Sequence, residues 1–430
     1  MDIKEILYSF EKCRCGRKHD ISAPVIICGS GISGDTGCII AEHTLFKKIL
    51  LVADKNTISV SEEAVFSLCV SGFVVQKYIY DNLRVADIGE VEKIESICGD
   101  SDIILSIGTG SLNDICRLAA FRQNKYFIIF ATAPSMDGFA SDTAPITCHG
   151  FKLSYQAKQP ELIIADTRIL SASPAVLKGA GFGDMIAKYI AVADWRISNL
   201  LTNEYLCPDI LNLTKTAADK IASLAPVIQN VDEAASGEVL NALIMTGVAM
   251  KLSGNSRPAS GAEHIISHFW ESKKLDAGEI SDFHGRKVAV GTLLTAKAYY
   301  SLLKIDKIKP KKENIECNML KKVYGERLYP DVEKMNFPDS INIVSNFDLD
   351  GFASKWDYIK NIIRDSIPEP AEIEKMLITA GAPTRPDQIG VSDELCIQGL
   401  RYHMYMRKRI TLMRLMPLIG ADPALLSGVL

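Results

Sequence analysis

Two of the chain's seven histidines lie four positions apart in "NSRPASGAEHIISHFWE", residues 255–271. A helix is expected to begin within this stretch, which would place His264 and His268 on one helix face. In "GFGDMIAKYIA", Asp184 and Lys188 are also four apart, within an otherwise apolar run. In "ISDFHGRKVAVG", His284 directly precedes an apolar helical pattern. These three stretches hold the residues best suited to chemistry in the second half of the chain.

One carboxylate and two or three imidazoles are a good ligand set for a divalent metal, and three protein ligands leave positions open for a substrate. Asp184, His264 and His284 are therefore candidate ligands. The competing interpretation is that all three are polar residues on packed helices, because spacing alone does not show that they converge. Lys188 also has two interpretations, since a buried lysine four residues from Asp184 can form an ion pair with it.

Two polar turns follow apolar strand patterns in the first half of the chain. In "SIGTGSLND", Gly108 and Gly110 would let a ligand approach the backbone, and the helix that follows offers N–H groups suited to a pyrophosphate. The alternative is an ordinary tight turn between strand and helix. The next strand ends in "ATAPSMDGFASDTAP", and ligands of open α/β sheets bind beyond such strand ends. Its polar candidates are Thr132, Ser135, Asp137 and Ser141.

A further acidic residue, Asp54, ends the strand pattern "KKILLVAD", where a carboxylate can bind the ribose hydroxyls of NAD. A carboxylate at this position would repel the 2′-phosphate of NADP, so NAD is weakly favoured over NADP. A plain turn residue is the alternative interpretation of Asp54.

The elements that must position these residues change character near Leu170. Before it, six short apolar runs alternate with helical patterns, which predicts βαβ units and a parallel sheet. After it, helical periodicity dominates, including the stretch "HMYMRKRITLMRLMPLI" at residues 403–419. We therefore expect an α/β dinucleotide-binding domain over residues 1–170 and an all-helical metal- and substrate-binding domain over residues 171–430. The lysine-rich segment 304–320 is expected to be a solvated excursion.

Composition excludes several classes of protein. Hydrophobic residues make up 47% and charged residues 23% of the 430 residues, which is typical of a globular protein with a core. The net charge of −4 gives no basic field for nucleic acid. No apolar run reaches the roughly 18 residues needed to span a bilayer. The 11 scattered cysteines, an odd number, favour a reduced cytoplasmic setting over a disulfide framework.

The N-terminal stretch "CRCGRKH" gathers Cys13, Cys15 and His19 within seven positions. Three such ligands suit a zinc knuckle, but a fourth is missing from the local run. A reduced, solvated hairpin is the interpretation we favour from the sequence alone.

Taken in order, "GTGSLND", "TAPSMDGFAS", "GFGDMIAKYIAVADW", "SRPASGAEHIISHFWE" and "HGRKVAVG" resemble the sn-glycerol-1-phosphate dehydrogenases, in particular their bacterial AraM-like branch. That family belongs to the superfamily of metal-dependent glycerol dehydrogenases and dehydroquinate synthases. The resemblance runs from about Pro24 to the end of the chain, except for the lysine-rich segment. The glycine turn departs from the family pattern by having threonine between its two glycines, and Met136 stands where smaller residues are common.

The resemblance implies the fold of the dehydroquinate synthase-like and iron-containing alcohol dehydrogenase-like proteins. It also implies that Asp184, His264 and His284 bind the metal, which would be zinc or nickel. Asp137, Asp184 and His268 look like substrate contacts with catalytic roles. The residues that resemble dinucleotide contacts are Asp54, Gly110, Ser111, Leu112, Asn113, Asp114, Thr132, Ala133, Pro134, Ser135 and Ser141.

The implied activity is the reversible reduction of dihydroxyacetone phosphate to sn-glycerol 1-phosphate with NAD(H) or NADP(H), for glycerophospholipid precursor synthesis, in a cytoplasmic homodimer. The substrate phosphate needs a cation, and we predict Arg257 for this role, with Lys188 as the second candidate. The alternatives are a glycerol or other polyol dehydrogenase on the same scaffold, a dehydroquinate synthase, and a catalytically silent binding protein. The product's stereochemistry follows from the resemblance alone.

Overall fold

The structure is a computed structural model that describes residues 3–313, 315, 317–336, 344 and 347–429. Its internal packing divides the chain into two compact units. The first unit comprises Met1–Cys148, Lys152–Phe182 and Ser223–Leu252. The second unit comprises His149–Phe151, Gly183–Ala222 and Ser253–Leu430. Two segments beyond the predicted boundary at residue 170 therefore pack with the first unit.

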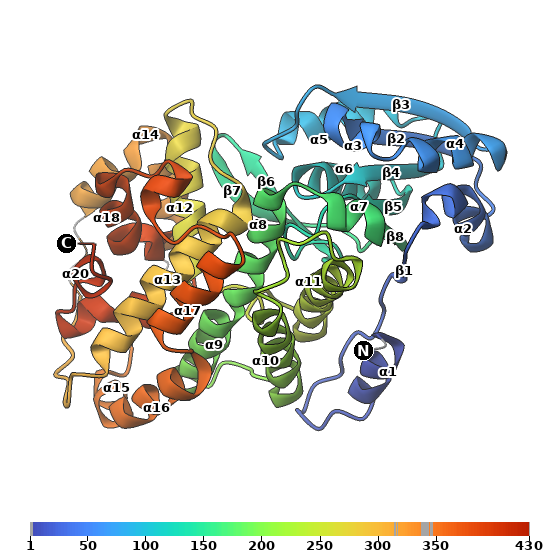
Figure 1. Cartoon of the computed structure of the whole chain (residues 1–430). Coiled ribbons are helices and arrows are strands. Elements are labelled where there is room, and N and C mark those ends of the chain that lie inside the picture. Colours follow the sequence, from blue (N-terminus) through green and yellow to red (C-terminus); the bar gives the residue numbers. More distant parts are fainter. Residues whose placement is uncertain (1–2, 314, 316, 337–343, 345–346, 430) are drawn as a thin grey trace. The chain divides into compact units, whose positions relative to one another are not determined.

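The first unit is built on a six-stranded parallel sheet with the order β1-β8-β5-β4-β2-β3 (Figure 1). The central strands β4, β5 and β8 are almost entirely buried, as expected for parallel strands covered on both faces. The predicted parallel sheet is thereby confirmed. Its strands are β1 (Val25–Gly29), β2 (Lys48–Asp54), β3 (Val74–Tyr80), β4 (Ile103–Gly108), β5 (Tyr126–Ala131) and β8 (Leu162–Asp166).

Alternate residues of the strands form one hydrophobic core with α2 (Thr36–His43) and α4 (Glu62–Val70). Helix α6 (Ser111–Arg122) packs on β4 and β5. The other helices that belong wholly or mostly to this unit are α1 (Ile3–Phe10), η1 (Ile32–Asp35), α3 (Lys55–Ser59), α5 (Ile88–Ile97), α7 (Thr167–Ala172), α8 (Ala175–Ile186) and α11 (Glu233–Ser253).

The strand order creates a topological switch between β2 and β4. The chain leaves β2 toward β3 on one side, whereas β4 pairs with the other side of β2 and leads on to β5. Crevices at such switch points bind ligands in open α/β sheets. Asp54 and the glycine turn after β4 follow these two strands. The strand order could not be read from the sequence.

A two-stranded sheet of β6 (Thr143–Cys148) and β7 (Phe151–Gln156) follows the second polar turn. This small sheet was not predicted from the sequence. Its strands are short and separated only by His149 and Gly150, both of which have positive φ angles.

The second unit is helical, and α12 (Ala262–Asp276) and α13 (His284–Leu302) lie side by side within it (Figure 1). Among the described residues, no helix combines the length and hydrophobicity needed to cross a membrane. The remaining α-helices are α9 (Lys188–Thr202), α10 (Pro208–Ser223), α14 (Cys317–Asn336, interrupted at Gly325), α15 (Leu349–Ser354), α16 (Trp356–Ser366), α17 (Pro370–Thr379), α18 (Asp393–Tyr402), α19 (Leu412–Leu415) and α20 (Pro423–Leu426). The short 3-10 helices are η2 (Pro386–Ile389), η3 (His403–Met406) and η4 (Met416–Ile419).

The prediction of one continuous helix over residues 403–419 is wrong. The chain leaves helical conformation at Arg407 and is extended again at Thr411, which caps α19 through its side chain. The Ile410 carbonyl accepts a hydrogen bond from Arg257, and the Leu412 N–H donates to Asp194. These partners are distant in sequence, so periodicity alone could not reveal the break.

The lysine-rich segment, expected to be solvated, is held to the C-terminal part of the second unit. The Lys311 N–H donates to the Leu418 carbonyl at 2.7 Å. Glu313 forms an ion pair with the fully buried Arg414 at 2.7 Å and accepts a hydrogen bond from Tyr405 at 2.6 Å.

Candidate active site

Three of the predicted ligands converge in the second unit. Asp184 lies near the end of α8, His264 in the first turn of α12, and His284 at the start of α13. Their candidate ligand atoms all lie within 4.8 Å of one another. The Nε2 atom of His264 is 3.3 Å from Oδ1 of Asp184, and the two imidazole centroids are 5.3 Å apart. One carboxylate and two imidazoles at this spacing fit a divalent metal.

A close approach of two helices brings Asp184 to His284. A Cβ atom on Gly183 would lie 2.6 Å from Cβ of Ala289 and 2.8 Å from the Gly285 carbonyl oxygen. Both contacts are far shorter than real Cβ contacts, so a side chain at position 183 would force α8 away from α13. Glycine at this position therefore determines how closely two of the ligands meet.

Glu263 orients its neighbour His264. Its Oε1 atom accepts hydrogen bonds from Nδ1 of His264 at 2.6 Å and from the Gly261 N–H at 2.8 Å. A carboxylate on one imidazole nitrogen leaves the other nitrogen to face a metal, which is the usual arrangement around metal-binding histidines. Glu263 stands in the motif that holds both histidines, but no role was predicted for it from the sequence. The sequence signal for such a role is a glutamate directly before a candidate metal-binding histidine.

Asp194 caps the helix that carries both histidines. Its Oδ2 atom accepts a hydrogen bond from the Ala262 N–H at 2.9 Å. Its Oδ1 atom accepts hydrogen bonds from the Tyr299 hydroxyl at 2.7 Å and from the Leu412 N–H at 2.9 Å. Burial raises the pKa of Asp194 to about 6, although these hydrogen bonds oppose the shift. No role was predicted for Asp194 from the sequence either.

Lys188 forms an ion pair with Asp184 at 3.1 Å and donates to the Ala259 carbonyl at 3.2 Å. Burial opposes the negative charge of Asp184, but Lys188 and the two ligand histidines together hold its pKa well below the usual range. Burial likewise opposes protonation of His264, yet its hydrogen bonds to Asp184 and Glu263 raise its pKa to about 9. A metal ion bound by this set would have to displace the proton from Nε2 of His264.

A second candidate constellation consists of His268, Glu271 and His284, and it shares His284 with the first. The imidazoles of His268 and His284 are stacked with centroids 5.6 Å apart. Glu271 forms an ion pair with the buried Lys287 at 2.8 Å. His268, predicted as a substrate contact, thus lies against the metal-ligand set and could also belong to an alternative set.

Arg257, predicted to bind the substrate phosphate, is bound within the protein. It is buried and donates to both carboxylate oxygens of Glu204, to the Ser198 hydroxyl at 3.0 Å and to the Ile410 carbonyl at 2.7 Å. All three of its nitrogens therefore bind within the protein, and Glu204 neutralises its charge. This geometry argues against a direct contact between Arg257 and a substrate phosphate.

Arg409 binds the segment that follows Arg257, and the charge of Arg407 acts on Arg409. Arg409 donates to the Ser260 carbonyl at 2.5 Å and to the Ser256 hydroxyl at 2.7 Å. Burial, followed by the charges of Arg257 and Arg407, lowers the pKa of Arg409 to about 9. Burial also lowers the pKa of Arg407. The charges of Glu204 and Glu263 oppose the lowering of the Arg409 pKa, so carboxylates of the protein partly balance this arginine cluster.

In the first unit, the two predicted polar turns are joined. The Thr109 hydroxyl lies 2.8 Å from the Ser135 hydroxyl. Arg117, fully buried, pairs with Asp114 at 3.1 Å and donates to the Gly138 and Phe139 carbonyls of the second turn. The glycine turn and the second polar turn thus form one rigid rim at the ends of β4 and β5.

Gly110 opens the N-terminus of α6 with φ +52° and ψ −120°, a conformation that residues other than glycine rarely adopt. A Cβ atom at this position would meet nothing within 4 Å, so space is open beside the helix terminus. Asn113 accepts a hydrogen bond from the Ser106 hydroxyl at 2.7 Å and fastens the helix to β4. The open helix N-terminus suits a phosphate group.

Met136 is explained by the structure of the second turn. Its Sδ atom accepts a hydrogen bond from the Gly138 N–H at 2.8 Å. The larger side chain is therefore part of the turn. Asp137 lies buried in this turn, within the first unit, and its substrate contact remains a prediction.

Asp54 caps α3, and its Oδ1 atom accepts hydrogen bonds from the Asn56 and Thr57 N–H groups, both at 2.9 Å. The turn-residue interpretation therefore describes part of its role. The carboxylate nevertheless lies at the carboxyl end of β2, beside the topological switch.

Comparison with known proteins agrees with this architecture. Residues 27–174 match the family described as iron-containing alcohol dehydrogenase. The glycerol-1-phosphate dehydrogenase (NAD(P)+) of Geobacillus stearothermophilus is 29% identical over 431 residues and 96% of each chain. The enzyme of the same name from Pyrococcus furiosus is 32% identical over 273 residues, which cover 63% of this chain and 77% of that protein. The chain belongs to the glycerol-1-phosphate dehydrogenase family.

The resemblance to the glycerol-1-phosphate dehydrogenases, predicted from five sequence motifs, is thus confirmed. The glycerol dehydrogenase of Schizosaccharomyces pombe superposes with a TM-score of 0.59 at 18% identity, over 95% of this chain and 91% of that chain. At this identity the likeness concerns the fold alone, and it confirms the predicted fold class. The roles of individual residues in binding the metal, the substrate and the dinucleotide remain predictions.

The two constellations that share His284 can be separated by their carboxylates. We expect Asp184→Asn to hold one metal ion per chain fewer than the wild type, because it removes an anionic ligand. Glu271→Gln should retain the wild-type content, because Lys287 already pairs with that carboxylate. Elemental analysis after dialysis against a defined free metal concentration measures both.

The exposed Asp219→Asn is the matched control in the same unit. Retention of the metal in Asp184→Asn together with its loss in Glu271→Gln would assign the ion to the second constellation instead.

Proposed function

We propose that this chain catalyses the reversible reduction of dihydroxyacetone phosphate to sn-glycerol 1-phosphate with NAD(P)H. The proposal is supported by one observation: the candidate metal-binding set and the arginine cluster both contact one loop, residues 256–260. Its Ala259 carbonyl binds Lys188, the partner of Asp184, and its Ser260 carbonyl binds Arg409. A metal-binding set for a ketone oxygen and cations for a phosphate are thus built around the same short segment.

Asp184, His264 and His284 would hold one divalent metal, zinc or nickel. When bound, the metal supplies a Lewis acid for the C2 ketone oxygen, and the dinucleotide supplies the hydride. Glu263 keeps the proton on Nδ1 of His264, so that Nε2 faces the ligand position. Lys188 balances the charge of Asp184 and holds its carboxylate in one orientation.

His268 lies one helical turn beyond His264, with its ring centroid 6.5 Å from that of His264. From this position we assign it the delivery of the proton that the C2 oxygen needs when hydride reaches the carbon. Its stacking on His284 restricts the imidazole to one plane. Asp137 remains the further substrate contact that the family resemblance implies.

Arg409 and Arg407 would bind the substrate phosphate in place of Arg257. The planar guanidinium of Arg409 is already oriented by two hydrogen bonds to the loop, which reduces the entropy lost on binding. An arriving phosphate would also relieve the repulsion among the three arginines. Arg257 then acts indirectly, by fixing Glu204 and the Ile410 backbone beside them.

The first unit would bind the dinucleotide at the open N-terminus of α6, with Asp54 on the adenosine ribose. NAD(H) is favoured over NADP(H) by the charge of Asp54. We further propose the cytoplasm as the compartment, a homodimer as the assembly, and glycerophospholipid precursor synthesis as the purpose of the reaction.

The activity can be tested directly. Metal-loaded protein should oxidise NADH with dihydroxyacetone phosphate at least about tenfold more efficiently, in kcat/KM, than with dihydroxyacetone, because charged hydrogen bonds to the phosphate are lost with the latter. The product should resist sn-glycerol-3-phosphate dehydrogenase. Equal efficiency with the two ketones, or preferential oxidation of glycerol, would instead indicate a polyol dehydrogenase.

The phosphate assignment predicts that Arg409→Ala raises KM for dihydroxyacetone phosphate by about tenfold or more, since one charge-assisted contact is removed. KM for dihydroxyacetone should change little. Steady-state kinetics with both ketones measures the difference, and the exposed Arg364→Ala is the matched control. If Arg257→Ala shows the selective effect and Arg409→Ala does not, the phosphate contact returns to Arg257.

The coenzyme assignment predicts that Asp54→Asn lowers the ratio of kcat/KM for NADH to that for NADPH by about fivefold or more, because a carboxylate repels the 2′-phosphate. Asparagine is as good a helix cap as aspartate, so α3 should remain intact. The measurement is initial rates with each coenzyme. An unchanged ratio would show that Asp54 acts only as a cap.

A further inference from the structure

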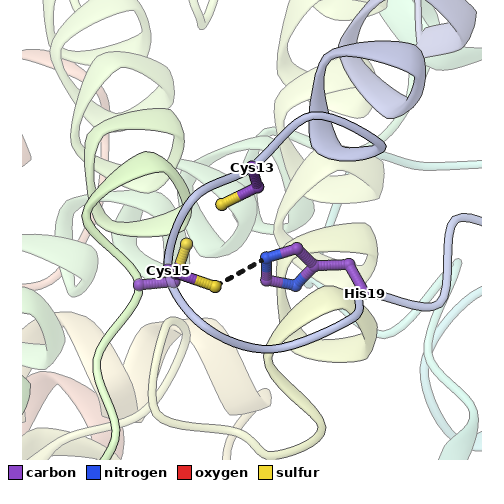
Figure 2. Close-up of side chains that lie close together, drawn as sticks. Cys13, Cys15 and His19 are labelled. Atoms are coloured by element: carbon purple, nitrogen blue, oxygen red, sulfur yellow. Dashed lines mark hydrogen bonds between the residues drawn. The ribbon is translucent and has the colours of Figure 1, made fainter.

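A second cluster of metal-type ligands lies in the first unit, in the loop that follows α1. Cys13, Cys15 and His19 come from this loop, and Figure 2 shows their side chains gathered within its curve. The Sγ atom of Cys15 lies 3.2 Å from Nε2 of His19. The candidate ligand atoms of the three residues are all within 4.8 Å of one another. None of them takes part in the proposed dehydrogenase reaction.

His19 is held in the orientation that metal binding requires. Its Nδ1 atom lies 2.7 Å from the Leu252 carbonyl oxygen, which can only accept, so Nδ1 carries the proton. Nε2, the other ring nitrogen, faces Cys15 and is the nitrogen available to a metal ion. A backbone carbonyl on the distal nitrogen is a common support for metal-binding histidines. The side chain is buried, and the Phe10 ring meets it edge-on at 5.2 Å.

The rest of the loop is also fastened to the first unit. Lys251 donates to the Ser22 hydroxyl at 2.5 Å and to the Gln159 side chain at 2.7 Å. It also pairs with Asp20 at 3.4 Å. Most residues of the loop are exposed, as the solvated hairpin favoured from the sequence predicts, but the loop contains no strand and its histidine is buried.

We propose that Cys13, Cys15 and His19 bind a structural zinc ion that locks the N-terminal segment onto the first unit. In a tetrahedral zinc site the ligand atoms are roughly 3.5–3.8 Å apart, given zinc–sulfur and zinc–nitrogen bonds of about 2.3 and 2.0 Å. The observed separations need only small adjustments to reach this geometry. Three protein ligands leave the fourth position for a further donor.

The donor chemistry selects zinc over the metals that carboxylates and waters hold. Two thiolates and a neutral imidazole are soft to borderline ligands, and the two thiolates balance the charge of the ion. Binding converts both thiols to thiolates and releases two protons, with no change of oxidation state. The ion would connect the end of α1 to the carbonyl of Leu252 through His19, across more than 230 residues of sequence.

Cobalt is the sharpest probe, because the Asp184, His264 and His284 set contains no sulfur. Protein loaded with two equivalents of Co²⁺ should show sulfur-to-cobalt charge-transfer absorption. Cys13→Ser and Cys15→Ser should each reduce this absorption strongly, whereas His264→Ala should keep it. Cys38→Ser and Cys69→Ser, exposed cysteines of the same unit, are the matched controls.

A second measurement does not depend on cobalt. The loop carries exposed Arg14, Arg17 and Lys18, which are trypsin sites. Zinc should slow cleavage there by about tenfold or more relative to chelator-treated protein, because binding suppresses local opening. In His19→Gln the rate should no longer respond to zinc. Mass spectrometry of the N-terminal peptides gives the rates.

Three results would overturn the zinc proposal. The first is wild-type protein without charge-transfer absorption at two equivalents of Co²⁺. The second is absorption unchanged in Cys13→Ser and Cys15→Ser. The third is a disulfide between these two cysteines in protein purified with zinc under reducing conditions. Each result leaves the dehydrogenase proposal standing, because ketone reduction is measured separately.

Discussion

The hydrogen bonds at the N-terminus of α12 determine where His264 and His268 lie, and the rest of the active site depends on them. Asp194 binds the first helical N–H, and Glu263 binds both the preceding N–H and His264 itself. A buried helix N-terminus with a capping carboxylate cannot rotate without leaving charged and polar groups unpaired. The same Asp194 also holds Tyr299 and the Leu412 backbone, so α9, α12, α13 and the C-terminal segment share one buried carboxylate.

Charge balance explains why so many ionisable groups are tolerated here. Asp184 and Glu263 are carboxylates, while Lys188 and His264 supply positive charge beside them. Burying any one of these charged groups without a partner would cost roughly several kcal/mol of folding free energy, whereas the mutually paired set is stable. The arginine cluster is different, because its three positive charges exceed the nearby carboxylates of Glu204 and Glu263. The charges of the candidate metal-binding set are therefore balanced within the protein, whereas the arginine cluster keeps an excess of positive charge.

Much of the first unit could be predicted from sequence because its signals are local. Each of the six strands is a short apolar run bounded by turn residues, and the glycine turn carries its own conformational requirement at Gly110. The convergence of Asp184, His264 and His284 could only be expected from the family resemblance. It depends on the close packing of Gly183 against Ala289, which no spacing rule expresses.

The surroundings of Arg257 and Arg409 could not be predicted, because they depend on tertiary hydrogen bonds that override local pattern. Arg257 adjoins the metal helix in sequence, yet Glu204, Ser198 and Ile410 bind its guanidinium. Arg409 is about 150 residues away, in a stretch whose periodicity predicted a continuous helix. Had that helix formed, the Ile410 carbonyl would have bonded within it rather than to Arg257. The break in the helix therefore also places Arg409 beside residues 256–260.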